Sequence, residues 1–382
     1  MKKIGIICEY NPFHNGHIYH LQKIKEMFPD SMIILVMSGE FTMRGEISLL
    51  NKWDKTKIAL KYGVSLVIEL PIIYAVNSSD MFAEGAIKIL ELLKCDYVIF
   101  GSESNDIETL TQITKTMINN PTFDTLVKEH LDNGHNYPTS LSYALKKIIN
   151  KDVNNPNDLL GISYIKQIII NNYHIKPMSI KRTNNYHDKE INNTITSATS
   201  IREALKNHYD ISNNVPKETN DLIIKDDITN NYFYLLKYQI INNLDNLSDF
   251  GDVSEGIDNL IKNNIFKAKS LNELIDLTKT KRYTYNRLNR IFIHILLNIK
   301  KKDINKLKEI KYIRILGFDK LGRNYLKEIK KEINIPLITK YSDIKNDNLS
   351  FQRKISSIYY MIINKEELNI IENKSIPIKK ED

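Results

Sequence analysis

The first hundred residues alternate between short apolar runs and segments with helical periodicity, and this alternation constrains the fold more than any other feature of the chain. The apolar runs are residues 2–7, 31–38, 65–70 and 96–101. Segments with helical spacing of apolar residues lie between them, at residues 17–28, 54–62 and 79–93. Strands and helices in alternation predict a parallel sheet with helices packed on its faces.

The pattern changes after about residue 210. Another strand is predicted at residues 175–180, and residues 196–205 read as a helix with a capped start. Further along, strand patterns largely disappear and helical segments take over, such as residues 287–299 and 321–331. The sequence therefore predicts an α/β nucleotide-binding domain at residues 1–210 and a mainly helical, basic domain at residues 211–382. The boundary falls between residues 205 and 230, where no Pro/Gly-rich linker marks it.

Positive charge is concentrated in one region of the chain. Residues 1–150 carry 15 Lys and Arg against 17 Asp and Glu, whereas residues 251–350 carry 22 against 12. Such a concentration is typical of a surface that binds a polyanion through its phosphates. The alternative is a lysine-rich composition that merely solvates helices. The side chains predicted to contact nucleic acid phosphates are Lys281, Arg282, Arg287, Arg290, Arg314, Lys320 and Arg323.

Composition is that of a soluble, globular protein. Of the 382 residues, 42% are hydrophobic and 26% are charged. The first residues reach Asn11 and Pro12 too soon for a signal peptide, and no apolar run has spanning length. The two cysteines, Cys8 and Cys95, flank predicted strands and are expected to be small core residues rather than a disulfide framework. We predict a cytoplasmic protein.

Three histidines, His14, His17 and His20, crowd the junction between the first predicted strand and the first helix. Helix N-termini carry partial positive charge, and phosphate is their usual ligand. Within the stretch HNGH, Gly16 would permit a tight turn, and His14 and His17 would donate ring N–H groups to phosphate oxygens. The alternative for a single histidine is a helix cap or a filler of a polar gap.

A second phosphate-binding element is predicted in the stretch TSATSIR. Ser197 and Thr199 would lie at a helix N-terminus, with Arg202 in the first turn. Hydroxyls, amides and a guanidinium suit the β- and γ-phosphates of a nucleotide. Alone, this stretch is also an ordinary helix cap.

Together, NPFHNGH and TSATSIR resemble the HxGH and ISSTxIR motifs of the Rossmann-like nucleotidyltransferase superfamily. More narrowly, the chain resembles the bacterial tRNA(Met) cytidine acetate ligases. That resemblance extends over most of the chain, in the blocks EYNPFHNGHIYHL, MSGEFTMRGE, KWDKTKIAL, VIELP, FGSES, PNDLLGISYIK, YHD, KRYTYNR and YIRILGFDKLGR.

The resemblance implies an enzyme that makes acetyl-adenylate from ATP and acetate and acetylates N4 of the wobble cytidine of elongator methionine tRNA. We also expect Mg²⁺ to bridge the phosphates of the ATP, and we expect neither a membrane nor DNA as a partner. Gly101 would let the nucleotide lie against the backbone, Asn157 would read a base or ribose edge, and Arg182 would clamp phosphate or carboxylate. The alternatives are that Gly101 only makes a turn, that Asn157 is a turn residue, and that Arg182 is an ordinary surface charge. The ATP site that the resemblance implies comprises Ile7, Cys8, Glu9, Tyr10, Asn11, Pro12, Phe13, His14, Asn15, Gly16, His17, Ile18, Tyr19, His20, Gly101, Asn157 and Arg182. The helix start in TSATSIR adds Ser197 and Thr199, and we predict His14, His17 and Arg202 as the catalytic residues.

Two segments depart from the family pattern. Thr183, Asn184 and Asn185 replace a glycine-rich turn before YHD. Met43 and the pair Ile47 and Ser48 replace Gln and Pro-Ala in the block MSGEFTMRGEIS, which we place beside the acyl or tRNA-facing side. Two other functions compete: an enzyme of the same fold that acts on a small metabolite, and an inert RNA-binding relative.

Overall fold

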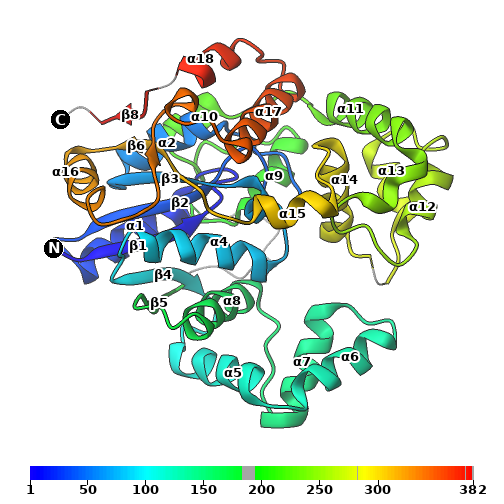
Figure 1. The fold of residues 1–382 in the computed structure, drawn as a ribbon, viewed down its shortest axis with the longest axis horizontal. Coiled ribbons are helices and arrows are strands. Elements are labelled where there is room, and N and C mark those ends of the chain that lie inside the picture. Colours follow the sequence, from blue (N-terminus) through cyan, green and yellow to red (C-terminus); the bar gives the residue numbers. More distant parts are fainter. Residues whose placement is uncertain (183–193, 282, 375, 381–382) are drawn as a thin grey trace.

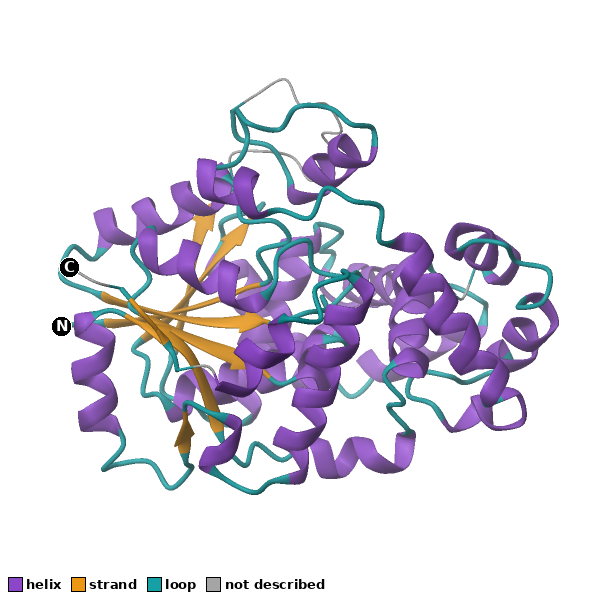
Figure 2. Ribbon diagram, turned by 90° about the horizontal axis from the view of Figure 1, so that it is seen from above, coloured by secondary structure: helices purple, strands orange, loops and turns teal. Residues whose placement is uncertain are grey.

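A single, mainly parallel sheet forms the centre of the computed structural model, which describes residues 1–182, 194–281, 283–374 and 376–380. The strand order is β5-β4-β1-β2-β3-β6-β7, and β8 pairs with β6. Helices cover both faces of the sheet, and a group of helices extends beyond one end of its strands (Figures 1 and 2). The strands are β1 (Lys3–Cys8), β2 (Met32–Ser38), β3 (Leu66–Leu70), β4 (Tyr97–Ser102), β5 (Lys176–Lys181), β6 (Ile313–Phe318), β7 (Leu337–Ile338) and β8 (Ile378–Lys379).

Strand β2 shows why the first part of the sequence makes a parallel sheet. All seven of its residues are buried, so the strand is apolar on both faces. Ile33 and Leu35 pack in one core cluster with helices α1 (Asn15–Met27) and α2 (Lys52–Lys61). Ile34 and Val36 pack in the other cluster with helix α4 (Ser79–Leu92). The predicted α/β fold with a parallel sheet is confirmed.

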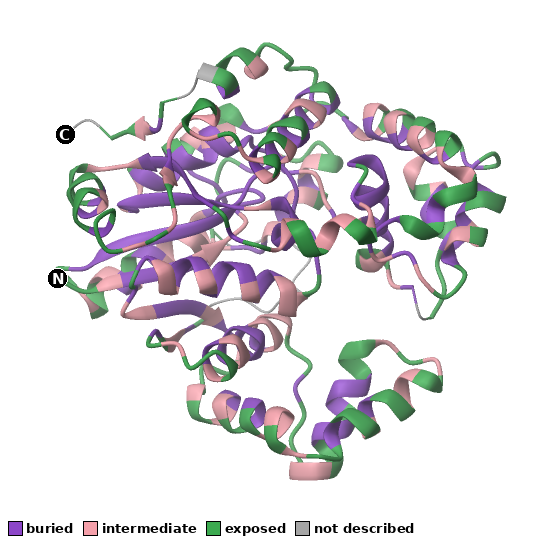
Figure 3. Ribbon diagram, viewed as in Figure 1, coloured by how far each residue is buried: buried purple, intermediate pink, exposed green. Residues whose placement is uncertain are grey.

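Helices connect the strands and build the remainder of the molecule. Strands β2 and β3 are buried along their whole length, whereas α12 and α13 carry buried and exposed residues in turn (Figure 3). The α-helices are α1 (Asn15–Met27), α2 (Lys52–Lys61), α3 (Ile72–Ala75), α4 (Ser79–Leu92), α5 (Ile107–Asn119), α6 (Phe123–Asp132), α7 (Tyr137–Ile149), α8 (Pro156–Ile170), α9 (Ala198–Lys206), α10 (Lys217–Leu222), α11 (Thr229–Asn242), α12 (Ile257–Asn264), α13 (Leu271–Thr278), α14 (Tyr285–Leu296), α15 (Lys301–Leu307), α16 (Lys320–Ile329), α17 (Asp347–Ile362) and α18 (Leu368–Lys374).

Strands largely disappear after about residue 210, as predicted, but three of them return to the sheet near the end of the described chain. Strand β6 pairs antiparallel with β3, with Leu66 opposite Phe318, and β7 and β8 pair with β6. Residues after 313 therefore return to the sheet, and the mainly helical part is confined to α11–α15. No helix within the described ranges has the length and apolar character needed to cross a membrane.

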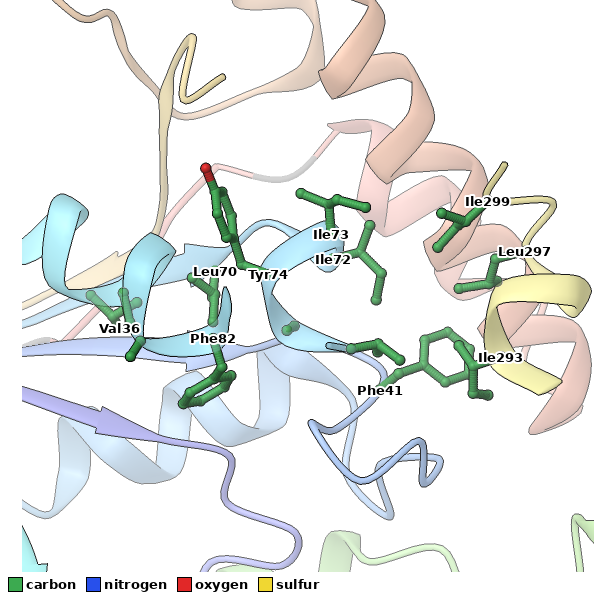
Figure 4. Close-up of a cluster of buried hydrophobic side chains, with 14 of the residues drawn as sticks. Val36, Phe41, Leu70, Ile72, Ile73, Tyr74, Phe82, Ile293, Leu297 and Ile299 are labelled. Carbon is green, nitrogen blue, oxygen red and sulfur yellow. The ribbon is translucent and has the colours of Figure 1, made fainter. Parts of the chain in front are cut away.

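Helix α14 packs against the loop that follows β2. Phe41 of that loop lies beside Ile293 of α14 in the buried cluster shown in Figure 4. A Cβ on Gly45 would lie 2.4 Å from the backbone nitrogen of Arg290, so only glycine permits this close approach. Gly45 also has a φ of +73°, which favours glycine for a second reason. The helical part thus contacts the carboxyl end of the sheet directly.

Candidate active site

The predicted motifs meet where β1 and β4 lie side by side. Strands β1, β2 and β3 proceed to one side of the sheet, and β4 and β5 extend it on the other, so the strand order reverses between β1 and β4. Ligands of such sheets bind outside the carboxyl ends of the strands at this switch point. His14 follows β1, and Gly101 lies near the end of β4.

The start of α1 fixes the two motif histidines in one tautomer. Nδ1 of His14 accepts a hydrogen bond from the backbone N–H of Gly16 at 3.0 Å. Nδ1 of His17 accepts from the backbone N–H of His14 at 3.2 Å, and the two ring centroids are 3.9 Å apart. A neutral imidazole whose Nδ1 accepts carries its proton on Nε2. Each ring therefore offers an Nε2–H donor, as a phosphate ligand requires.

All three histidines are held in the neutral form. Burial, together with the positive charges of Arg182 and Arg202, lowers the pKa of His14 to about 3. Burial and the charge of Arg182 lower the pKa of His20 to about 4. The pKa of His17 lies well below its ordinary value, chiefly through burial and then through His14, His20 and Arg182. These rings therefore act as hydrogen-bond donors and not as fixed cations.

Gly16 is required for space rather than for a turn. It lies inside α1, and a Cβ at this position would lie 2.8 Å from Cε1 of His14. The expectation that Gly16 makes a tight turn is therefore wrong. A glycine here lets the imidazole of His14 lie over the first turn of its own helix.

Helix α9 brings the second motif to the first. Ser197 is the N-cap residue, and its side chain accepts from the backbone N–H of Ser200 at 3.1 Å. Side-chain Nδ2 of Asn15 donates to the carbonyl of Thr194 at 2.9 Å, which ties the segment before α9 to the start of α1. The helix begins at Ala198, so Arg202 lies in its second turn and not in the first turn as predicted.

Arg202 reaches back across the site. Its Nη1 donates to the backbone carbonyl of Asn11 at 2.9 Å. Its Nη2 lies 3.0 Å from Oε2 of Glu46 and donates to Oε1 of the same carboxylate at 3.1 Å. Thr199 Oγ1 accepts a longer bond from Nη2, at 3.4 Å. Residues from the loops after β1 and β2 thus orient a guanidinium carried by α9.

The remaining predicted nucleotide residues lie at the ends of β4 and β5. A Cβ on Gly101 would lie 3.3 Å from Cγ of Arg182, so the arginine stem passes over the glycine. The backbone N–H of Arg182 donates to the carbonyl of Ser102 at 3.0 Å. Asn157 lies in the first turn of α8, and its Nδ2 donates to Oε1 of Glu103 at 2.5 Å. The structure therefore brings Gly101 and Arg182 together and places Asn157 on the helix beside them.

Lys55 was given no role from the sequence, yet its ammonium group binds backbone carbonyls at the carboxyl ends of β1 and β2. Lys55 is fully buried, and its Nζ donates to the carbonyls of Glu9, Ser38 and Gly39 at 3.1, 2.7 and 2.6 Å. Burial lowers the pKa of Lys55 to about 8. Buried carbonyls at strand ends need donors, and Lys55 supplies three. The resemblance block KWDKTKIAL was the only signal for it.

The predicted nucleic acid residues do not form one surface. Arg314 is 1% exposed, with its guanidinium 4.5 Å from the ring centroid of Tyr341, so the prediction that it contacts phosphates is wrong. Its strand is covered by the segments that follow it in the chain. Arg282 lies outside the described residues, as do Thr183, Asn184 and Asn185.

Two arginines on α14 are partly buried and paired with acids. Arg287 donates to Ser254 Oγ at 3.0 Å and lies 3.8 Å from a carboxylate oxygen of Glu255. Arg290 donates through Nε to Asp252 at 3.2 Å. These pairs hold α14 to the loop before α12, so part of their charge is used within the protein.

Lys320 and Arg323 lie on α16, at the opposite end of the strands from the histidines. The N-cap residue of α16, Asp319, donates its backbone N–H to the carbonyl of Ser65, directly before β3. Helix α16 therefore starts at the amino end of β3, whereas the histidines follow the carboxyl end of β1. Lys281 is exposed and lies shortly before α14.

Within the described ranges, no group of three or more His, Cys, Asp or Glu side chains is arranged to hold a metal ion.

This combination of fold and site is that of a nucleotidyltransferase. The sequence matches the family described as HIGH Nucleotidyl Transferase over residues 1–374, and the chain belongs to that family. Within it, the chain belongs with the tRNA(Met) cytidine acetate ligases. The ligase of Geobacillus sp. (strain WCH70) is 40% identical over 380 residues, which cover 95% of each chain. That of Clostridium acetobutylicum is 39% identical over 387 residues, 95% of this chain and 96% of the other.

Solved structures show the same relationship in three dimensions. Thermotoga maritima TmcAL in its apo form I has a TM-score of 0.90 and 28% identity, over 99% of both chains. The same protein bound with alpha-thio ATP has a TM-score of 0.88 and 27% identity, again over 99% of both chains.

Proposed function

We propose that this chain is a cytoplasmic ligase that uses ATP to join acetate to N4 of the wobble cytidine of elongator methionine tRNA. One observation supports the ATP step above all: the neutral His14 and His17 lie near Arg182 and Arg202, beside the starts of α1 and α9, at the switch point of the sheet. The similarity to tRNA(Met) cytidine acetate ligases over 95% of the chain supports the choice of substrates.

In the first step, a carboxylate oxygen of acetate attacks the α-phosphorus of ATP, and pyrophosphate leaves. The product, acetyl-adenylate, has an acyl carbonyl with a good leaving group, which free acetate lacks. Negative charge grows on the phosphate oxygens during this step. Donors fixed in advance stabilise that charge without reorganisation, and Nε2–H of His14 and His17 are such donors. The guanidinium of Arg202 would bind the β- and γ-phosphates.

In the second step, the exocyclic amine of cytidine attacks the acetyl carbon, AMP leaves, and the amine loses a proton. The cytosine amine is a weak nucleophile because its lone pair is delocalised into the ring, so an activated acyl donor is needed. The base must also leave its stack to reach the donor, which an anticodon loop permits.

The tRNA would approach the carboxyl end of the sheet from the side of α14. Helix α14 contacts the loop after β2, and the region from residue 251 to 350 carries the positive excess of the chain. Lys281, Arg287 and Arg290 would contribute phosphate contacts there. Such contacts give affinity and register but carry no sequence information.

Exchange of labelled pyrophosphate into ATP tests the first step. We expect exchange that requires acetate and does not require tRNA, because acetate and ATP contain every reacting atom. Incubation with tRNA should then yield N4-acetylcytidine, detected by mass spectrometry of the digested RNA. Transfer to a small metabolite without any RNA product would support the small-metabolite enzyme. No exchange with any acid, together with retained tRNA binding, would support the inert relative.

A further inference from the structure

Glu46 joins the predicted phosphate-binding arginine to a loop that is firmly held. Both carboxylate oxygens of Glu46 lie close to Nη2 of Arg202, at 3.1 and 3.0 Å. The two side chains are largely buried, with 25% and 19% of their surfaces exposed. A charge-assisted hydrogen bond in such a setting restricts a guanidinium strongly.

The loop that carries Glu46, residues 39–48, is fixed at both ends. Oε1 of Glu40 accepts from Ser356 Oγ at 2.9 Å and lies 3.2 Å from Nζ of Lys52. At the other end, the carbonyl of Ser48 accepts from the hydroxyl of Tyr359 at 2.8 Å. These anchors lie inside the protein, where water does not compete for them.

The middle of the loop is fixed as well. The backbone N–H of Met43 donates to Oε1 of Glu9 at 2.6 Å, and that of Thr42 donates to the carbonyl of Glu46 at 3.0 Å. Phe41 packs on Ile293 (Figure 4). A carboxylate on this loop therefore has a defined position relative to the strand end that leads to His14.

Arg202 is also held by the loop after β1. Nη1 donates to the carbonyl of Asn11, so the guanidinium is held from the loops after β1 and β2 at once. A guanidinium has five N–H donors, and these contacts use only part of them. Its plane is set by Glu46 and Asn11, and Nη2 also reaches Thr199 Oγ1 at 3.4 Å. Within the described part of the chain, the donors that do not face these three residues are left for an anionic ligand.

We infer that Glu46 is a positioning residue for the ATP step: its carboxylate sets the plane of the Arg202 guanidinium so that the other N–H groups of Arg202 meet the triphosphate. The inference rests on the proposed function for the identity of the ligand as ATP. It predicts that removing the charge of Glu46 lowers catalysis through Arg202 and not through loss of the fold.

The test uses Glu46→Gln and Glu46→Ala, alone and combined with Arg202→Met. We expect each Glu46 variant to lower kcat for acetate-dependent pyrophosphate exchange by about 10- to 100-fold, since a small misplacement of a binding group costs that much. The double variants should be no slower than Arg202→Met alone, because Glu46 acts through Arg202. Glu26→Gln is the matched control, since Glu26 pairs with Lys23 on the exposed surface of α1, and its activity should equal that of the parent protein.

Three results would overturn the inference. Additive losses in the double variants would mean that Glu46 acts on its own. A lower KM for ATP with unchanged kcat would make Glu46 a competitor for Arg202. A large fall in melting temperature with full activity of the folded fraction would make the pair structural.

The proposed function is tested separately in the same experiment. A parent protein that binds ATP but shows no acetate-dependent exchange would contradict the proposed function alone. In that case ATP affinity, measured by calorimetry, decides the role of Glu46 in the same single and double variants. Losses of affinity that are not additive with Arg202→Met support the inference, and additive losses overturn it.

Discussion

The imidazole of His14 lies directly over Gly16, with its Nδ1 3.0 Å from the backbone nitrogen of that glycine. A methyl group at residue 16 would approach the ring to 2.8 Å. We therefore predict that Gly16→Ala displaces His14 and slows acetyl-adenylate formation by about 10- to 100-fold. Stability should fall little, because alanine favours a helix over glycine by up to about 1 kcal/mol.

Gly101→Ala provides the comparison. Its Cβ would meet the flexible stem of Arg182 at 3.3 Å, which can move aside, so the loss of rate should be smaller. Pyrophosphate exchange and thermal melting of both variants check this. Full activity of Gly16→Ala would mean that the position of the His14 ring is unimportant.

Replacement of the donors themselves should be more severe. His17→Ala, and to a lesser degree His14→Ala, should suppress adenylate formation by a factor of about 10² to 10³, the usual cost of roughly 3 to 4 kcal/mol for one fixed donor to a developing charge. His14→Ala also removes the side chain that accepts from Gly16, so its stability should fall by about 1 kcal/mol. Exchange kinetics and urea unfolding separate the two effects. Variants that melt early yet work at full rate per folded molecule would mark the histidines as structural.

Acid should destabilise the fold through these histidines. His20 has a pKa lowered to about 4, while an unfolded histidine titrates near pH 6.5. Between those values the unfolded chain binds a proton that the folded chain does not, so stability falls as the pH drops. We expect His20→Asn to make the free energy of unfolding less dependent on pH between 6.5 and 4, by up to about 1.4 kcal/mol per pH unit. Urea unfolding at several pH values measures this, and an unchanged slope would contradict it.

Local pattern was enough to predict the first strands of the sheet. The run at residues 31–38 became β2 (Met32–Ser38), and the run at residues 65–70 became β3 (Leu66–Leu70). Both strands are buried on two faces, so their sequences are nearly continuous apolar runs. Strand β6 was missed because Arg314 and Gly317 interrupt its apolar run, and local pattern carries no information on its pairing with β3.

Charged residues were the hardest to place from sequence. Arg314 was expected on a surface, yet it is buried against Tyr341, which only the folded chain brings near. The pair of Arg202 and Glu46 spans 156 residues, so no spacing rule could reveal it. The histidine motif was predictable because its members are local.

A buried charge cluster around Lys52 of α2 should contribute strongly to the free energy of unfolding. Nζ of Lys52 lies 2.7 to 3.2 Å from carboxylate oxygens of Glu40, Glu69 and Glu372, and all four side chains are buried. Lys52→Met would leave three buried carboxylates without their cation, at a cost of roughly 3 to 5 kcal/mol. Lys57→Met on the same helix removes the pair between the exposed Lys57 and Asp54, whose carboxylate also accepts from Asn51, and should change stability little. Urea unfolding compares the two, and equal stabilities would contradict the importance of the cluster.

Basic residues at the carboxyl and amino ends of the strands should differ in their effect on tRNA binding. Lys281 is exposed beside α14, which contacts the carboxyl end of the sheet, whereas α16 starts at the amino end. We predict that Lys281→Glu weakens tRNA binding and lowers the salt slope of affinity by about one, the effect of one lost phosphate contact. Lys320→Glu with Arg323→Glu should leave both quantities unchanged, because the reacting base must reach the carboxyl end.

Affinity for tRNA at three or more salt concentrations measures the slope for each variant. Pyrophosphate exchange without tRNA should continue at the parental rate in both, since neither substitution touches the residues that surround His14. Lys281 is preferable to Arg287 and Arg290 for this purpose, because those arginines pair with Glu255 and Asp252 and their reversal would also disturb α14. A loss of tRNA affinity in the α16 variant alone would place the tRNA at the amino end of the strands. Unchanged affinity in both variants would mean that these basic residues only form a solvated surface.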